Sequence, residues 1–282
     1  SSLAFENDIK VDTSFFDQAS ESYRKIRNTL RFLLSNTFDY SGPKTHEELN
    51  SVLNQINPHS IDAWILAQLS ELQRNVSNAY QKYQFKEVHI QLYNFCNDTL
   101  SAIYCAAVKD RLYCDAPDSK RRLSTQQTIA KLILTLCELL SPILPHTSEE
   151  AYSAFTITKS ETFHAQPIPA FNYQITTNWD HIMTQRQAVL KALENAKANG
   201  LENTLDCEVV LSEDPAIIPF IDELSDLFGV SRVKFGIELS INDLRSKPRC
   251  ERSWRRDKTV KERSNNTWLS DRDAIAIGIQ KE

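Results

Sequence analysis

The stretch YRKIRNTLRFLL, residues 23–34, determines how the first part of the chain folds. Its apolar residues recur at the 3.6-residue spacing of a helix with one buried face, and this pattern begins at Phe15. The other face carries side chains at i, i+3 and i+7, which share one stripe of a helix. They are Arg24, Arg27 and Arg31, with Asn28 beside them. We therefore predict an amphipathic helix that ends before Gly42 and presents a row of positive charge.

Length and composition are typical of a soluble, mostly helical protein. The chain has 282 residues, of which 41% are hydrophobic and only 5 are glycine, so it can bury a core in about two domains. It has no apolar run of about 18 residues that could span a bilayer, and no secretory leader at its start. The six cysteines lack paired spacing, which is typical of buried thiols in a reducing compartment. We expect an intracellular protein and, because the chain starts at Ser1 without methionine, a segment of a longer one.

Positive charge is concentrated near the C-terminus. The net formal charge is −5, yet the segment 245–263 holds nine basic and three acidic residues, which indicates a site for a polyanion. There Arg252, Trp254, Arg255 and Arg256 interleave guanidinium groups with an aromatic ring. This mixture suits single-stranded RNA, where stacking is worth about 1–3 kcal/mol per base. The alternative is a Trp254 buried in a small core, and the sequence leaves both open.

Periodicity predicts further helices in the first half of the chain. Their apolar positions run from Ile61 to Tyr80, from Val88 to Val108 and from Leu123 to Leu140, before Pro142. The residues 147–150 offer a capping box for one more short helix. Short loops between such helices favour an antiparallel bundle, which we assign to residues 1–160.

The pattern changes after a proline-containing crossover, residues 161–178. We expect a helix over 179–199, a strand over 205–211, a helix over 216–228 and a strand over 232–239. These elements would form a small α/β subdomain over 179–244, followed by a basic lobe over 245–282. The predicted fold class is therefore mainly α: an antiparallel helical bundle, a small α/β subdomain and a C-terminal lobe.

Motifs of self-sufficient catalysis are missing from the sequence. It contains no G-x-G-x-x-G or G-x-x-x-x-G-K-[ST] phosphate loop, no H-E-x-x-H pair, and no serine in a G-x-S-x-G setting. The adjacent Glu149 and Glu150 fall in an expected first helical turn, where the helix dipole explains them. We therefore expect no catalytic residue and no metal ligand in this chain, and a binding function instead.

The candidate binding residues are basic, amide or aromatic. They are Arg24, Arg27, Asn28 and Arg31 in the first helix, Lys109 and Arg111 at the end of a later one, and Arg252, Trp254, Arg255 and Arg256 in the C-terminal segment. For each single charge, the alternative explanation is a solvated helix face, or a charge that offsets the dipole at a helix end.

Six stretches, in this order, resemble the C-terminal part of a bacterial-type isoleucyl-tRNA synthetase. They are YRKIRNTLRFLLSN (23–36), KDRLY (109–113), SPILPHTSEEAY (141–152), WDHIMTQRQAVLKALENAK (179–197), DLFGVSRVKF (226–235) and CERSW…LSDRD (250–273). The resemblance covers essentially the whole chain. Valyl, leucyl and methionyl enzymes share the helical bundle, and a valyl-type domain is an alternative, but the RNTLRFLL wording and the C-terminal segment favour the isoleucyl family.

This resemblance implies that the bundle is an anticodon-binding domain. It implies that the row of Arg24, Arg27 and Arg31 faces the anticodon stem-loop of tRNA(Ile), while Lys109 and Arg111 grip backbone phosphates beside it. It also implies catalytic and editing domains upstream in the same polypeptide, which use ATP and magnesium to attach isoleucine to the tRNA. Their HIGH and KMSKS motifs do not occur in this sequence. A cytoplasmic monomer without a membrane partner is expected.

One departure from the family concerns metal. The family pattern has two Cys-x-x-Cys pairs that hold a structural zinc, and the matching positions here are Cys250, Ser253, Ser270 and Asp273. One thiolate, two alcohols and a carboxylate are a poor set of zinc ligands. We therefore expect a degenerate zinc-ribbon-like lobe without zinc. Trp254 and Trp268 would form its core, with hydrogen bonds around Ser270, Arg272 and Asp273.

Two other classes of protein remain open on the sequence. A non-catalytic RNA-binding protein or tRNA chaperone would share the basic surface and have no catalytic half. A structural helical adaptor would bind protein through an apolar face and show no affinity for RNA. The concentration of charge in 245–263 argues against the adaptor.

Overall fold

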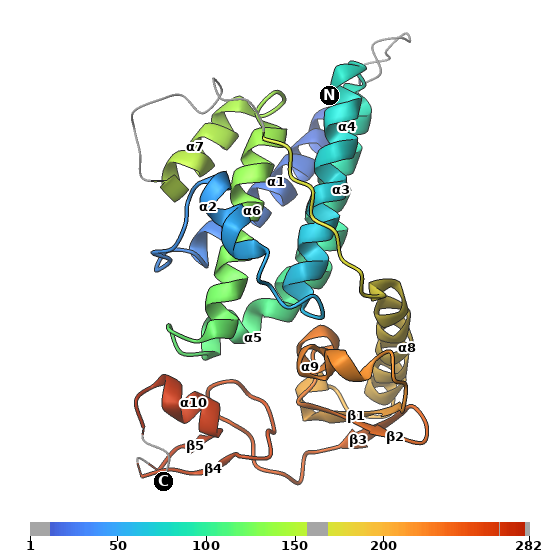
Figure 1. The fold of residues 1–282 in the computed structure, drawn as a ribbon. Coiled ribbons are helices and arrows are strands. Elements are labelled where there is room, and N and C mark those ends of the chain that lie inside the picture. The colour runs from blue at the N-terminus through green and yellow to red at the C-terminus, as the bar shows by residue number, and fades with distance from the viewer. Residues whose placement is uncertain (1–11, 157–168, 265, 280–282) are drawn as a thin grey trace. The chain divides into compact units, whose positions relative to one another are not determined.

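The computed structural model describes residues 12–156, 169–264 and 266–279. It is mainly helical with two small sheets (Figure 1). The chain separates into two compact units. Unit 1 comprises 1–57, 62–104 and 124–175, and unit 2 comprises 58–61, 105–123 and 176–282. The segment 105–123, which we expected within the bundle, therefore belongs to the unit that contains the sheet.

Unit 1 is built from helices joined by short loops. They are α1 (Ser14–Ser35), α2 (His46–Leu53), α3 (Ile61–Gln81), α4 (Phe85–Asn94), the π-helical η1 (Phe95–Cys105), α6 (Lys120–Leu140) and α7 (Pro145–Thr156). The helices α1, α3 and α6 confirm the predicted spacing. Apolar periodicity does not predict α2, because only Leu49 and Leu53 of its eight residues are buried. The helix α7 begins at Pro145, ahead of the expected capping box, since proline is well suited to the first turn of a helix.

Helix α6 is the central helix of unit 1. Every residue from 128 to 140 is buried, and α6 runs between the other helices of this unit (Figure 1). Its polar residues are hydrogen-bonded inside the core. The Thr125 hydroxyl donates to Asp62 of α3 at 3.0 Å, and Tyr104 of η1 donates to the same carboxylate at 2.7 Å. Because a buried polar group without a partner is costly, these bonds fix how α3, η1 and α6 pack together.

A lysine is buried in the same core. Lys131 of α6 has 0% exposure. Its ammonium lies 2.7 Å from Nδ1 of His46 and 4.3 Å from the centre of the Phe171 ring. The other ring nitrogen of His46, Nε2, lies 2.6 Å from Glu138. Burial lowers the pKa of Lys131 to about 8, although Glu138 acts in the opposite direction.

An extended segment, residues 169–175, lies against α3 and supplies Phe171. Of the crossover expected over 161–178, residues 161–168 lie outside the described part of the chain. Two side chains of α3 bind the backbone of this segment. Ser70 donates to the Phe171 carbonyl at 2.9 Å and accepts from the Tyr173 amide at 3.1 Å. Gln73 donates to the Pro169 carbonyl at 2.9 Å and accepts from the Phe171 amide at 2.8 Å.

Unit 2 contains α5 (Ala106–Cys114), α8 (Trp179–Ala198), α9 (Ile221–Phe228) and two small sheets. The larger sheet has the order β2-β1-β3, with β1 (Cys207–Ser212), β2 (Arg232–Gly236) and β3 (Ser240–Asp243). The strands β1 and β2 are parallel, with Val209 opposite Val233, while β3 is antiparallel to β1. The smaller sheet pairs β4 (Lys261–Glu262) with β5 (Trp268–Leu269), and α10 (Asp271–Ala276) follows.

The strand predicted over 232–239 is too long. It stops at Gly236, where a Cβ atom would approach Val210 to 2.6 Å, and Ile237 is 98% exposed. The chain then turns back into β3. The alternation of apolar residues continues through this turn, so it does not mark the end of the strand.

Lys131 provides a test of the unit 1 core. Its folded-state pKa of about 8 lies below the ordinary value, so the folded chain releases this proton before the unfolded chain does. The burial cost is therefore present in full below about pH 8 and is relieved as pH rises to about 10.5, by up to about 3 kcal/mol. Lys131→Met has no such group. We expect the unfolding free energy of the unaltered chain, relative to Lys131→Met, to increase over this window.

The comparison is made by urea unfolding followed by circular dichroism. The stability of the unaltered chain is compared with that of Lys131→Met because a second group also titrates at high pH. Burial raises the pKa of the Cys105 thiol to about 12, and its ionisation destabilises both proteins alike, so this effect cancels in the difference. Parallel stability curves would show that Lys131 does not titrate in the core.

Candidate nucleic-acid interface

The exposed face of α1 carries the predicted basic row. Ile26, Leu30 and Leu33 are buried against the rest of unit 1, and this fixes the helix with its arginines on the outside. Arg24, Arg27 and Arg31 are exposed, as is Asn28. Lys25 points to a different side, where its ammonium donates to the Tyr93 hydroxyl of α4 at 3.2 Å.

A pocket lies between α1 and α7, beside this row. Its volume is about 290 Å³, and its lining combines apolar and charged groups. The apolar part is Leu30, Leu34, Ala151 and Ala154, and the polar part is Arg27, Arg31, Ser35, Thr147 and Glu150. A flat apolar ring with an attached anion would match both parts, because the ring can lie on the aliphatic side chains while the guanidinium groups face the charge.

The arginines of the row are only loosely paired. Arg24 lies 3.6 Å from Glu21 and Arg27 lies 3.9 Å from Glu150, and all four side chains are about half exposed or more. Exposed pairs of this kind contribute roughly 0–1 kcal/mol. The guanidinium groups can therefore exchange these carboxylates for another anion at little energetic cost.

The two residues predicted at the end of the third helix differ sharply. Lys109 is exposed. Arg111 is 1% exposed and donates to Asp226 at 2.8 Å and to Glu223 at 3.0 Å. We correct the prediction that Arg111 grips an RNA phosphate, because its guanidinium is enclosed and already bound by two carboxylates.

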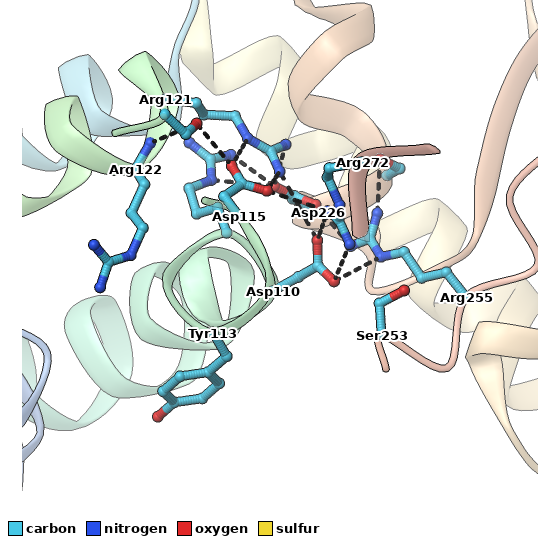
Figure 2. A network of polar contacts seen from close by, with 12 residues as sticks. Asp110, Tyr113, Asp115, Arg121, Arg122, Asp226, Ser253, Arg255 and Arg272 are labelled. Carbon is cyan, nitrogen blue, oxygen red and sulfur yellow. Dashed lines mark hydrogen bonds and ion pairs between the residues drawn. The ribbon is translucent and has the colours of Figure 1, made fainter. Parts of the chain in front are cut away.

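Arg111 belongs to a network of ion pairs inside unit 2. Figure 2 shows its members Asp226, Arg121 and Arg255. The buried Asp226 of α9 also binds Arg255 at 2.7 Å and Arg121 at 3.3 Å. Burial alone would raise the pKa of Asp226, but Arg111, Arg255 and Arg121 outweigh it and hold that pKa below its ordinary value. Arg121 also holds Asp115 with two bonds of 2.9 Å. The network joins α5, the start of α6, α9 and the C-terminal lobe.

The folded C-terminal segment presents less positive charge than its sequence suggests. Three of its predicted binding arginines pair with acids of unit 2. Arg255 binds Asp226 and Asp110, Arg256 binds Asp206 at 2.6 Å, and Arg252 lies 3.7 Å from Asp273 and donates to the Tyr113 carbonyl. Most of these acids are far away in the sequence, so counting charges over 245–263 overestimates the positive charge that this segment presents.

Trp254 lies on the surface of the lobe. It is 57% exposed, its φ angle is +60°, and the guanidinium of Arg249 lies 5.8 Å from the centre of its ring. The core expected from Trp254 and Trp268 is therefore wrong, because Trp268 is also 40% exposed. The buried core of the lobe consists of smaller residues: Cys250, Val260, Leu269 and Ala274, with Ile279 packed against them.

Sequence reasoning missed several residues of these surfaces. Arg249, which lies over Trp254, and Glu150 and Thr147, which line the α1–α7 pocket, were not among the candidates. Spacing within one helix can find a row such as that on α1. It cannot pair α1 with α7, which lies more than a hundred residues away in the sequence.

The described residues offer neither a metal site nor a membrane span. No group of three His, Cys, Asp or Glu side chains among them is arranged to hold a metal ion. None of the helices in the described ranges combines the length and the apolar character needed to cross a bilayer.

Comparison with known proteins identifies the family of the chain. Residues 62–211 match the family model described as the anticodon-binding domain of tRNA ligase. The isoleucine–tRNA ligase of Petrotoga mobilis is 35% identical over 248 residues, covering 83% of this chain and 26% of that protein. Isoleucine–tRNA ligase 1 of Oceanobacillus iheyensis is 31% identical, over 98% of this chain and 32% of that protein. The isoleucine–tRNA ligase of Listeria innocua is 38% identical, over 70% of this chain and 21% of that protein.

The chain thus spans between about a fifth and a third of the length of these relatives. The family model covers more than half of the chain, across most of unit 1 and into β1 of unit 2. The chain belongs to the anticodon-binding domain family of tRNA ligases.

Proposed function

We propose that this chain binds the anticodon stem-loop of tRNA(Ile) as the recognition part of an isoleucine–tRNA ligase. The observation that carries the proposal is the match of residues 62–211 to the anticodon-binding domain of tRNA ligase. The relatives named above are isoleucine–tRNA ligases, which supports tRNA(Ile) as the partner. ATP- and magnesium-dependent attachment of isoleucine then takes place on other domains of a monomeric, cytoplasmic enzyme.

In unit 1 the RNA contacts the exposed row of α1. Arg24, Arg27 and Arg31 neutralise backbone phosphates, and Asn28 offers an amide to a base or a sugar. The α1–α7 pocket accepts one unstacked base on Leu30 and Leu34, since anticodon bases in a loop can be splayed out of their stack.

In unit 2 the C-terminal lobe contributes a stacking surface. Trp254 presents an exposed ring with the guanidinium of Arg249 over it, and Lys247 and Lys258 are exposed cations of the same segment. The ion pairs of Arg252, Arg255 and Arg256 hold the lobe in place, so these residues support the stacking surface without contacting the RNA. By this proposal the lobe is a degenerate, metal-free form of the zinc ribbon that the family carries.

The α1 row is tested by reversing its charge. We expect Arg27→Glu with Arg31→Glu to weaken binding of an anticodon stem-loop hairpin by about tenfold or more, equivalent to about 1.4 kcal/mol. The slope of log K against log salt should also become shallower by about 0.7–0.9 for each lost phosphate contact. Affinity is measured by fluorescence anisotropy, and helix content by circular dichroism.

The matched control is Lys191→Glu with Lys197→Glu, which changes the net charge equally at two exposed positions of α8. If both double variants lose the same affinity, the effect comes from net charge and the α1 row is not the site.

The stacking surface is tested by Trp254→Ala. Because stacking is worth about 1–3 kcal/mol per base, we expect the affinity for the hairpin to fall between about 5-fold and 150-fold, with the lobe still folded. Trp268→Ala removes the other exposed indole of the lobe and should leave the affinity nearly unchanged. Equal affinities of the Trp254→Ala and unaltered chains would remove this ring from the interface.

The division of labour is tested by pyrophosphate exchange. The sequence contains no glycine-rich phosphate loop and neither HIGH nor KMSKS, so the 282-residue chain should show no isoleucine-dependent exchange with ATP while it still binds the hairpin. Exchange activity in a homogeneous preparation of the chain would contradict the assignment of catalysis to other domains.

A further inference from the structure

Four side chains of the C-terminal lobe converge on one oxygen atom. The Oδ2 atom of Asp273 accepts hydrogen bonds from Ser270 at 2.6 Å, from Ser253 at 2.9 Å, from the Cys250 thiol at 3.2 Å and from Arg272 at 3.2 Å. Asp273 is 0% exposed. Cys250 and Ser253 lie on one turn of the chain and Ser270 and Asp273 on another, so the carboxylate joins two segments that the sequence separates.

These positions do not fit a metal ion. A tetrahedral zinc site needs thiolate or imidazole lone pairs directed at a shared empty centre, about 2.0–2.3 Å from each ligand. Here the only thiol and both hydroxyls donate hydrogen bonds, and the atom that they surround is a negatively charged oxygen. The polarity of the centre is therefore the reverse of that in a metal site.

We propose that the Asp273 carboxylate takes the structural place of a metal ion and holds the lobe together as an anionic centre. Burial opposes its ionisation, but the hydrogen bond from Ser270, the charge of Arg272 and the donors Ser253 and Cys250 favour it. Each donor is a fixed side chain on one of the two turns. The carboxylate therefore crosslinks them as a metal would, with bonds of charge-assisted strength.

The small core of the lobe gives such a crosslink a large share in its stability. Among the described residues of the lobe, the apolar core has four buried members, Cys250, Val260, Leu269 and Ala274, and the sheet consists of two strands of two residues each. A core of this size is too small to stabilise a fold without an added constraint such as a disulfide or a metal. Asp273 provides that constraint by hydrogen bonding.

The same carboxylate positions the lobe on α5. Arg272 binds Asp273. It also contacts Asp110 of α5 and Asp115, the latter at 3.4 Å (Figure 2). Arg252 lies 3.7 Å from Asp273 and donates to the carbonyl of Tyr113 at 2.8 Å. Both arginines are thus held between Asp273 and α5, so loss of the carboxylate should loosen the lobe internally and also on α5.

The first experiment replaces the charge and keeps the shape. In the full chain, Asp273→Asn should speed hydrogen exchange of the backbone amides over 250–274 by about tenfold or more, while the amides of α6 stay unchanged. The control is Glu262→Gln at an exposed position of β4, which should exchange like the unaltered chain. A chelator should have no effect on the unaltered chain. Unchanged exchange in Asp273→Asn would overturn the proposal, and so would one zinc per chain whose removal unfolds the lobe.

The second experiment converts the centre. With Cys250 already in place, Ser253→Cys, Ser270→Cys and Asp273→Cys together supply four thiolates at the converging positions. We expect this triple variant to bind one Co²⁺ or Zn²⁺ per chain, with the visible absorption of tetrahedral cobalt thiolate. Slow exchange over 250–274 should return with metal and be lost again with chelator. Absence of metal binding would show that the side chains at positions 250, 253, 270 and 273 do not surround a common centre as metal ligands do. That result would also overturn the proposal.

Discussion

Asp226 is the group on which unit 2 depends. A carboxylate this deeply buried is costly unless positive charge surrounds it, and removal of one partner from a buried pair destabilises a protein by about 3–5 kcal/mol. Three arginines meet this requirement, one from α5, one from the start of α6 and one from the C-terminal lobe. Because these three segments must all reach the same side chain, the position of α9 determines where each of them lies. The main effect of these ion pairs is therefore to fix the relative positions of the segments of unit 2. This explains why so many arginines of the unit face inward.

This requirement separates the arginines into two groups that the sequence does not distinguish. Arg27 and Arg111 both look like basic residues on an amphipathic helix. Arg27 meets Glu150 loosely at the surface, whereas Arg111 lies enclosed between two carboxylates. Only the first kind can exchange its partner for a phosphate without a large cost in desolvation. The proposed RNA contacts of the bundle accordingly reduce to the row on α1. In unit 2, Lys109 of α5 is a further exposed cation.

Much of the fold could be predicted because its signals are local. Apolar spacing located α1, α3, α6 and α8, and the left-handed Gly229 closes α9 as a helix-ending glycine should. What failed depends on partners distant in sequence. The short α2 is stabilised by what it packs against, β3 by its pairing with β1, and the inward role of Arg111 by Asp226, 115 residues away. The exposure of Trp254 could not be inferred either, because the core of the lobe brings together Cys250, Leu269 and Ala274, which lie apart in the sequence.

The extended segment 169–175 has a consequence for the order in which the chain folds during synthesis. Phe171 covers Lys131, and Ser70 and Gln73 hold the backbone around it, about a hundred residues after α3 in the sequence. When α7 has just been made, α6 therefore has all its helical neighbours of unit 1 and still exposes its lysine on one side. Contacts between such distant residues form late. Unit 1 therefore cannot complete its core until residues 169–175 have left the ribosome.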